Sequence, residues 1–78
     1  MPKVLYFKGY EFFFYSNEGN EPMHIHVGKA EGIGKIWLEP DVEISYMYGF
    51  NSREEKEILI IVHDQIESFK NYWNEYFK

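Results

Sequence analysis

Hydrophobic and polar residues alternate along the first half of the chain, a pattern that is typical of β-strands. Aromatic and β-branched residues, which favour strands, dominate these segments. A Lys8-Gly9 pair separates the first two segments and suits a tight hairpin turn. The predicted strands are Val4–Phe7, Tyr10–Tyr15, Met23–Val27, Ile33–Leu38 and, with a less regular alternation, Val42–Tyr48.

The second of these segments carries aromatic rings on both of its faces. Tyr10, Phe12 and Phe14 point to one side, whereas Phe13 and Tyr15 point to the other. A strand with two apolar faces is usually covered on both sides. We therefore expect this strand to lie in the middle of the sheet and to be covered on both faces.

The last third of the chain has the period of a helix, because apolar residues recur there at spacings of three and four. Ser52 followed by Glu55 predicts a capping box at its start, with Phe50 as the staple residue. The pattern continues over residues 53–77, which corresponds to about 37 Å at about 1.5 Å per residue. This is long for so small a domain, so we expect a bend near His63-Asp64 or an overhang onto a second copy.

The two halves together predict one α+β domain over residues 1–78. An antiparallel β-meander of four to five short strands, at about residues 3–48, precedes a long C-terminal helix at about residues 52–77. That helix is either bent or divided into two helices.

Aromatic residues make up 21% of the chain, which has no cysteine. Large buried rings are therefore the means by which so small a domain can stabilise its core. We expect Phe12, Phe14, Trp37, Phe69 and Trp73 in that core. The rings that we expect to lack a cover are Tyr46, Tyr48, Tyr72 and Phe77.

Composition and charge exclude several classes of protein. Without cysteine there is no disulfide scaffold, zinc-thiolate site or thiol nucleophile. We find no apolar run of membrane-spanning length and no secretory leader, so we expect a cytoplasmic protein that does not enter a membrane. The net charge of −5 is shared by both halves and disfavours nucleic acid as a partner.

The sequence His24-Ile25-His26 is the strongest local candidate for chemistry. Alternate residues of a strand share one face, so the two imidazoles lie side by side. Such a pair can begin a divalent-metal site, or it can act as an acid and a base near neutral pH. The structural alternative is a half-exposed pair that donates hydrogen bonds to loop carbonyls.

A metal site needs a third ligand, and the sequence leaves four candidates open: Glu18, Glu21, Glu39 and His63. The polar loop Ser16–Pro22 directly precedes the histidines and can line a pocket over their strand. We therefore predict His24 and His26 as metal-binding or catalytic residues with help from Glu21. The predicted ligand-binding residues of the loop are Asn17, Glu18 and Asn20.

Taken together, the chain resembles a small prokaryotic family, the domain of unknown function 4160. The most specific segment is Ser-Asn-Glu-Gly-Asn-Glu-Pro-x-His-x-His-Val, at residues 16–27. Further segments of the resemblance are Phe7–Tyr15, Trp37–Pro40, Gly49-Phe50 and Trp73–Phe77. The residues to which the shared motif points are Asn17, Glu18, Asn20, Glu21, His24, His26, Trp37, Glu39 and Pro40.

The resemblance implies a short intracellular protein that is often encoded beside another small protein, an arrangement that suggests a toxin–antitoxin-like system. Many members look basic between the Glu-Pro break and Gly-Phe, whereas Val42–Tyr48 is apolar, acidic and aromatic here.

Two functions remain open at this point. The first is a protein-interaction module that associates with itself or with a small operon-encoded partner. The second is an enzyme that depends on a divalent metal or on His24 and His26, with RNA cleavage as the first reaction to test.

Overall fold

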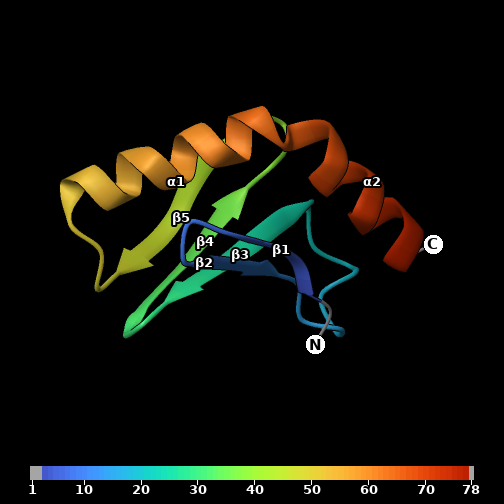
Figure 1. Ribbon diagram of the computed structural model, residues 1–78. Coiled ribbons are helices and arrows are strands. Elements are labelled where there is room, and N and C mark those ends of the chain that lie inside the picture. The colour runs from blue at the N-terminus through green and yellow to red at the C-terminus, as the bar shows by residue number, and fades with distance from the viewer. Residues whose placement is uncertain (1–2, 78) are drawn as a thin grey trace.

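The computed structural model describes residues 3–77, which form five strands followed by two helices (Figure 1). Each strand pairs antiparallel with its neighbour in the chain, in the order β1-β2-β3-β4-β5. The predicted α+β meander is therefore confirmed. The elements are β1 Lys3–Phe7, β2 Tyr10–Phe13, β3 His24–Lys29, β4 Gly32–Trp37, β5 Glu43–Tyr48, α1 Ser52–Asp64 and α2 Ile66–Tyr76.

Helix α1 lies across one face of the sheet, and α2 runs down past the end of the sheet (Figure 1). The alternate strand residues that point toward them form the core with the apolar stripe of α1 and α2. Buried members of this core include Phe12, Ile25 and Ile36 from the sheet and Ile58 and Val62 from α1. The opposite face of the sheet is called the open face, because among the helices of residues 3–77 only the side chain of Trp73, from α2, reaches over its edge at His24.

The expectation that the second strand is covered on both faces is wrong. Tyr15 follows β2 and is 41% exposed, although Tyr10, Phe12 and Phe14 are buried as expected. Phe13 lies on the open face, since it pairs with His26 across the strands. Its ring stacks on the imidazole of His26 at 5.6 Å between centroids. Contact with a neighbouring side chain therefore takes the place of a second layer.

The helical region is divided in two at Gln65, which ends α1 and begins α2. This confirms the predicted bend. The change of direction brings Phe69 within 5.4 Å of Phe12 and Trp73 within 5.3 Å of Phe14, measured between ring centroids. The bend therefore lets α2 cover the end of the sheet near the loop between β2 and β3 (Figure 1).

The capping box lies one residue before the predicted position. Asn51 is the N-cap, and its Oδ1 accepts from the backbone N–H of Glu54 at 2.8 Å. The Glu54 carboxylate accepts in return from the backbone N–H of Asn51 at 3.0 Å. Asn51 and Glu54 have the same spacing as Ser52 and Glu55, so the pattern alone does not separate the two pairs.

Four of the five predicted core rings are buried, namely Phe12, Phe14, Phe69 and Trp73. Trp37 is only half-buried, so its prediction is wrong. Of the rings expected to lack a cover, Tyr48 and Tyr72 are exposed, whereas Tyr46 and Phe77 are half-buried. Phe77 packs against Trp73 with 4.3 Å between ring centroids. Within residues 3–77, neither helix combines the length and the apolar character that a membrane span requires.

Candidate metal centre

His24 and His26 project from β3 on the open face, as the alternation predicts. They are nevertheless buried, with exposed fractions of 0% and 4%. The edge of the His24 ring contacts Trp73 of α2 at 4.9 Å and Trp37 of β4 at 5.5 Å between centroids. Tyr15 packs in the same way on His26 at 4.6 Å. The pair is therefore buried and not half-exposed, although His24 does form the hydrogen bond to a loop carbonyl that the structural alternative expects.

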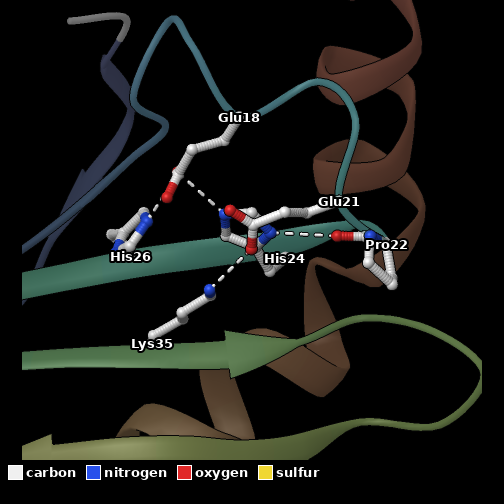
Figure 2. Close-up of polar contacts among 6 residues, drawn as sticks. All are labelled: Glu18, Glu21, Pro22, His24, His26 and Lys35. Atoms are coloured by element: carbon white, nitrogen blue, oxygen red, sulfur yellow. Dashed lines mark hydrogen bonds and ion pairs between the residues drawn. The ribbon is translucent and has the colours of Figure 1, made fainter.

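Glu18 joins the two histidines. Its Oε1 atom lies 2.8 Å from Nε2 of His24 and 2.8 Å from Nε2 of His26 (Figure 2). The loop between β2 and β3 carries Glu18 and folds back over the strand to reach this position. Three side chains therefore converge on one point above the open face.

The other nitrogen of His24 has a fixed role. Its Nδ1 lies 2.9 Å from the backbone oxygen of Pro22, and a carbonyl oxygen only accepts, so Nδ1 carries a proton (Figure 2). This hydrogen bond orients the ring and leaves Nε2 directed at Glu18. Metal-binding histidines are commonly held in this way, with one nitrogen on a carbonyl and the other on the metal.

Both nitrogens of His24 therefore face oxygen atoms. In the metal-free protein, both contacts are hydrogen bonds only when the ring carries two protons. A metal ion bound to Nε2 requires just the one proton on Nδ1, which the Pro22 carbonyl accepts. The hydrogen bond to Pro22 thus leaves Nε2 as the nitrogen of His24 that is available to a metal ion.

The charge states of Glu18 and His26 follow from their surroundings. Burial raises the pKa of Glu18, but hydrogen bonds from His24 and His26 outweigh it and bring the pKa below its ordinary 4.5. Burial lowers the pKa of His26 below its ordinary 6.5, although the hydrogen bond to Glu18 opposes this effect. Glu18 is therefore ionised and His26 is mainly neutral at neutral pH, the forms in which both groups bind metals.

The donor geometry suits a divalent transition metal. One donor atom from each of Glu18, His24 and His26 lies within 4.8 Å of the other two. Ligand atoms on a tetrahedral zinc ion, with bonds of about 2.0–2.1 Å, lie about 3.3–3.4 Å apart, so the two N···O hydrogen-bond distances of 2.8 Å must widen by about 0.5 Å to admit the ion. Two imidazoles and one carboxylate form the donor set of hydrolytic zinc sites and of non-haem iron(II) sites.

Of the four candidate third ligands, only Glu18 contacts the histidines. The Glu21 carboxylate pairs with Lys35 at 2.8 Å instead (Figure 2). The Glu39 carboxylate accepts from the backbone N–H of Met23 at 2.8 Å, which fastens the end of the loop directly before β3. His63 is exposed on α1, on the other side of the sheet. The predicted ligand-binding residues Asn17 and Asn20 are exposed in the loop beside Glu18.

Sequence reasoning missed the neighbours of His26 on the open face. Phe13, His26, Lys35 and Tyr46 pair in register across β2, β3, β4 and β5. The Lys35 ammonium lies 4.4 Å from the centre of the Trp37 ring. Burial raises the pKa of Tyr46, although the nearby Lys35 opposes the shift. The strand alternation places each residue on a face, but only the register of the sheet brings them together.

A groove of about 450 Å³ opens beside His26 on the same face. Its walls and floor include Tyr6, Glu11, Phe13, Tyr15, Gly28 and Ile33. Because His26 also lines the groove, a bound molecule can reach the candidate metal centre from it.

Comparison with known proteins places this architecture in one family. The family model described as Domain of unknown function (DUF4160) matches residues 9–74, a segment that contains the entire Glu18–His24–His26 cluster. Searches of curated proteins and of solved structures gave no match. The family match extends over most of the 78 residues, so the chain belongs to the DUF4160 family.

Proposed function

We propose that this protein binds a divalent transition-metal ion through Glu18, His24 and His26 and uses it for hydrolysis. The observation that carries the proposal is the convergence of two Nε2 atoms on one carboxylate oxygen, at 2.8 Å each. The Pro22 carbonyl supports it further, because it holds His24 in the tautomer that presents Nε2 to the metal.

The number of ligands is the one that hydrolytic metal sites use. Structural zinc sites are closed by four protein ligands, whereas catalytic sites keep a position open beside three. Glu18, His24 and His26 are three, and His26 lies at the wall of an open groove. A metal ion bound there supplies a water molecule with a lowered pKa, while the groove positions the substrate beside it.

Metal titration with matched variants tests this proposal. We expect Zn²⁺ to bind the metal-free protein in isothermal titration calorimetry with one ion per chain. Glu18→Gln, His24→Gln and His26→Gln should each weaken binding by at least about 100-fold, since loss of an outer-shell partner alone costs about 10- to 100-fold. His63→Gln is the matched control, because His63 is exposed on α1 and should leave the affinity unchanged.

Two results would overturn the metal proposal. One is a wild-type protein that binds none of Zn²⁺, Fe²⁺ or Mn²⁺ in these titrations. The other is binding that falls equally in His63→Gln and in the three cluster variants. Circular dichroism of each variant separates loss of a ligand from loss of the fold.

A second candidate function is protein association, and exposed rings on the open face favour it. Tyr6 and Tyr48 are 74% and 66% exposed, and exposed aromatic groups are enriched at protein interfaces. We propose that two copies associate through this face, and that the small protein encoded beside members of the family is the alternative partner in a toxin–antitoxin-like system. Light scattering after gel filtration, with and without the neighbouring gene product, tests this proposal. A monomeric mass that stays the same when the neighbouring gene product is added would contradict it.

A further inference from the structure

The groove on the open face owes its shape to a glycine. Tyr6, Glu11, Gly28, Ile33 and Tyr48 form one cross-strand row over all five strands. Gly28 is the middle member of this row and contributes no side chain, so the sheet is hollow between its larger neighbours. The resulting groove of about 450 Å³ has a backbone floor and side-chain walls.

The walls of this groove combine aromatic rings with one carboxylate. Tyr6, Phe13 and Tyr15 supply the rings, and Glu11 is the acidic residue among the lining side chains. Aromatic faces and a carboxylate together favour a cation on an apolar stem, since the rings attract positive charge and also cover the methylene groups.

The Glu11 carboxylate already forms an ion pair with a lysine of the same chain. The Lys3 ammonium lies 2.9 Å from Oε2 of Glu11, and the Lys3 side chain is 66% exposed. An ion pair that is so open to solvent contributes little stability and is readily exchanged. The position of Lys3 thus indicates where the charged group of a ligand would lie.

The other lysines near the groove direct their charges elsewhere. The Lys29 ammonium lies 4.7 Å from the Tyr10 ring centre and 3.8 Å from Glu54, both on the helix side of the sheet. The Lys35 ammonium is held by Glu21 at 2.8 Å. Lys29 lines the groove but directs its charge away, so displacement of Lys3 leaves the Glu11 carboxylate unpaired there, and the net charge of −5 attracts cations to the whole protein.

We propose that this groove binds a lysine or arginine side chain of a partner polypeptide, with its cationic group at Glu11 and its methylene stem against Tyr6 and Phe13. The site shares this groove with His26 of the Glu18–His24–His26 cluster but does not require a bound metal ion. Because His26 lines the same groove, the bound side chain lies next to the candidate metal centre.

Titration of a capped arginine hexapeptide into the metal-free protein, in the presence of EDTA, tests this inference. Amide chemical shifts report the binding, and those of Gly28 and Ile33 should move most. The matching citrulline hexapeptide has nearly the same shape without the charge, and we expect it to bind about tenfold more weakly.

Three substitutions in the groove and one control on α2 locate the peptide. Glu11→Gln should weaken the arginine peptide about tenfold, whereas Glu67→Gln on the exposed surface of α2 makes the same change in net charge and should have no effect. Lys3→Met should strengthen binding, because it removes the internal competitor. Gly28→Val should abolish binding by filling the floor, where an added Cβ atom meets Phe13 and Gly32 only at ordinary contact distances of 3.7 and 3.9 Å.

Equal affinity for the arginine and citrulline peptides would overturn the inference, as would equal effects of Glu11→Gln and Glu67→Gln. Preferential binding of a phosphorylated peptide or of an oligonucleotide would also overturn it. If Gly28→Val does not fold, Glu11→Gln and Lys3→Met still decide the question. Zinc titration of Glu11→Gln should be normal, so failure of this inference is distinguishable from failure of the metal proposal.

Discussion

Gly19 lies directly against the ring of Phe77, so close that a Cβ atom at Gly19 would be 2.6 Å from Cδ1 of that ring. This contact fastens the loop that carries Glu18 to the end of α2. Phe77 is itself held by Trp73, whose ring also contacts His24. The position of the Glu18 carboxylate therefore depends on the C-terminal helix as well as on β3.

We predict that Gly19→Ala weakens Zn²⁺ binding without unfolding the protein. The added methyl group must displace either the loop or the Phe77 ring, and a displaced loop moves Glu18 away from the two histidines. A loss of about tenfold, the lower end of the range for outer-shell partners, is expected in calorimetric titration. Gly19→Ala combined with Phe77→Leu should recover part of the affinity, because the smaller side chain makes room. An unchanged affinity in Gly19→Ala would show that the loop position does not depend on this contact.

A second prediction concerns acid stability in the metal-free protein. The pKa values of His26 and Glu18 both lie below their ordinary values of 6.5 and 4.5, so the unfolded chain binds more protons than the folded one in acid. The free energy of unfolding should therefore begin to decrease as the pH falls below about 6.5 and decrease further below about 4.5.

Urea unfolding at a series of pH values between 7.5 and 4 measures this effect. His26→Gln lowers the stability at every pH through lost packing, but it should remove the part of the slope that lies between pH 7 and 5. His63→Gln is the control and should keep the wild-type slope, since His63 is exposed. A stability that rises as the pH falls from 7 to 5 would contradict the lowered pKa of His26.

Much of this fold is predictable from local pattern, because each strand and helix has its own period. The alternation of Tyr10, Phe12 and Phe14 against Phe13 and Tyr15 assigns each residue to a face. What covers each face is a tertiary property. The rings of Tyr10, Phe12 and Phe14 pack on the helix side of the sheet. The rings of Phe13 and Tyr15 pack against the imidazole of His26 on the open face.

The candidate site was predictable only in part, for a similar reason. The spacing of His24 and His26 on one strand places both imidazoles on one face. The choice of Glu18 over Glu21 depends on the path of the loop, and one contact along that path joins Gly19 to Phe77, a residue at the far end of the chain. No spacing within residues 16–26 contains this information.

A third prediction concerns Tyr10, whose hydroxyl donates to Oε1 of Glu57 at 2.7 Å. Burial, together with this hydrogen bond, raises the pKa of Tyr10 to about 12 from its ordinary 10.0. The contribution of the Tyr10 hydroxyl to the free energy of unfolding is therefore fully present below pH 10. This contribution should be lost as the pH rises from about 10 toward 12, because the unfolded chain releases the proton at a lower pH than the folded protein does.

Absorbance titration of the tyrosines measures this directly. In the folded protein, an ionisation step that belongs to Tyr10 should appear near pH 12 or on unfolding. Tyr10→Phe should remove that last step and lower the stability at pH 7 by about 1 kcal/mol, since the ring stays buried and only one hydrogen bond is lost. Tyr72→Phe, at an exposed position, is the control. If all seven tyrosines ionise together near pH 10, the hydroxyl of Tyr10 is not held as described.

The last prediction separates the two overlapping capping patterns at the start of α1. Asn51 accepts from the backbone N–H of Glu54, so Asn51→Ala should lower the free energy of unfolding by about 1 kcal/mol. Ser52 is the first residue of the helix, and Ser52→Ala should change the stability little, or raise it slightly, because alanine is the better helix former. Urea unfolding of both variants at pH 7 measures the difference. The reverse order would place the cap at Ser52 and would move the first turn of α1 by one residue.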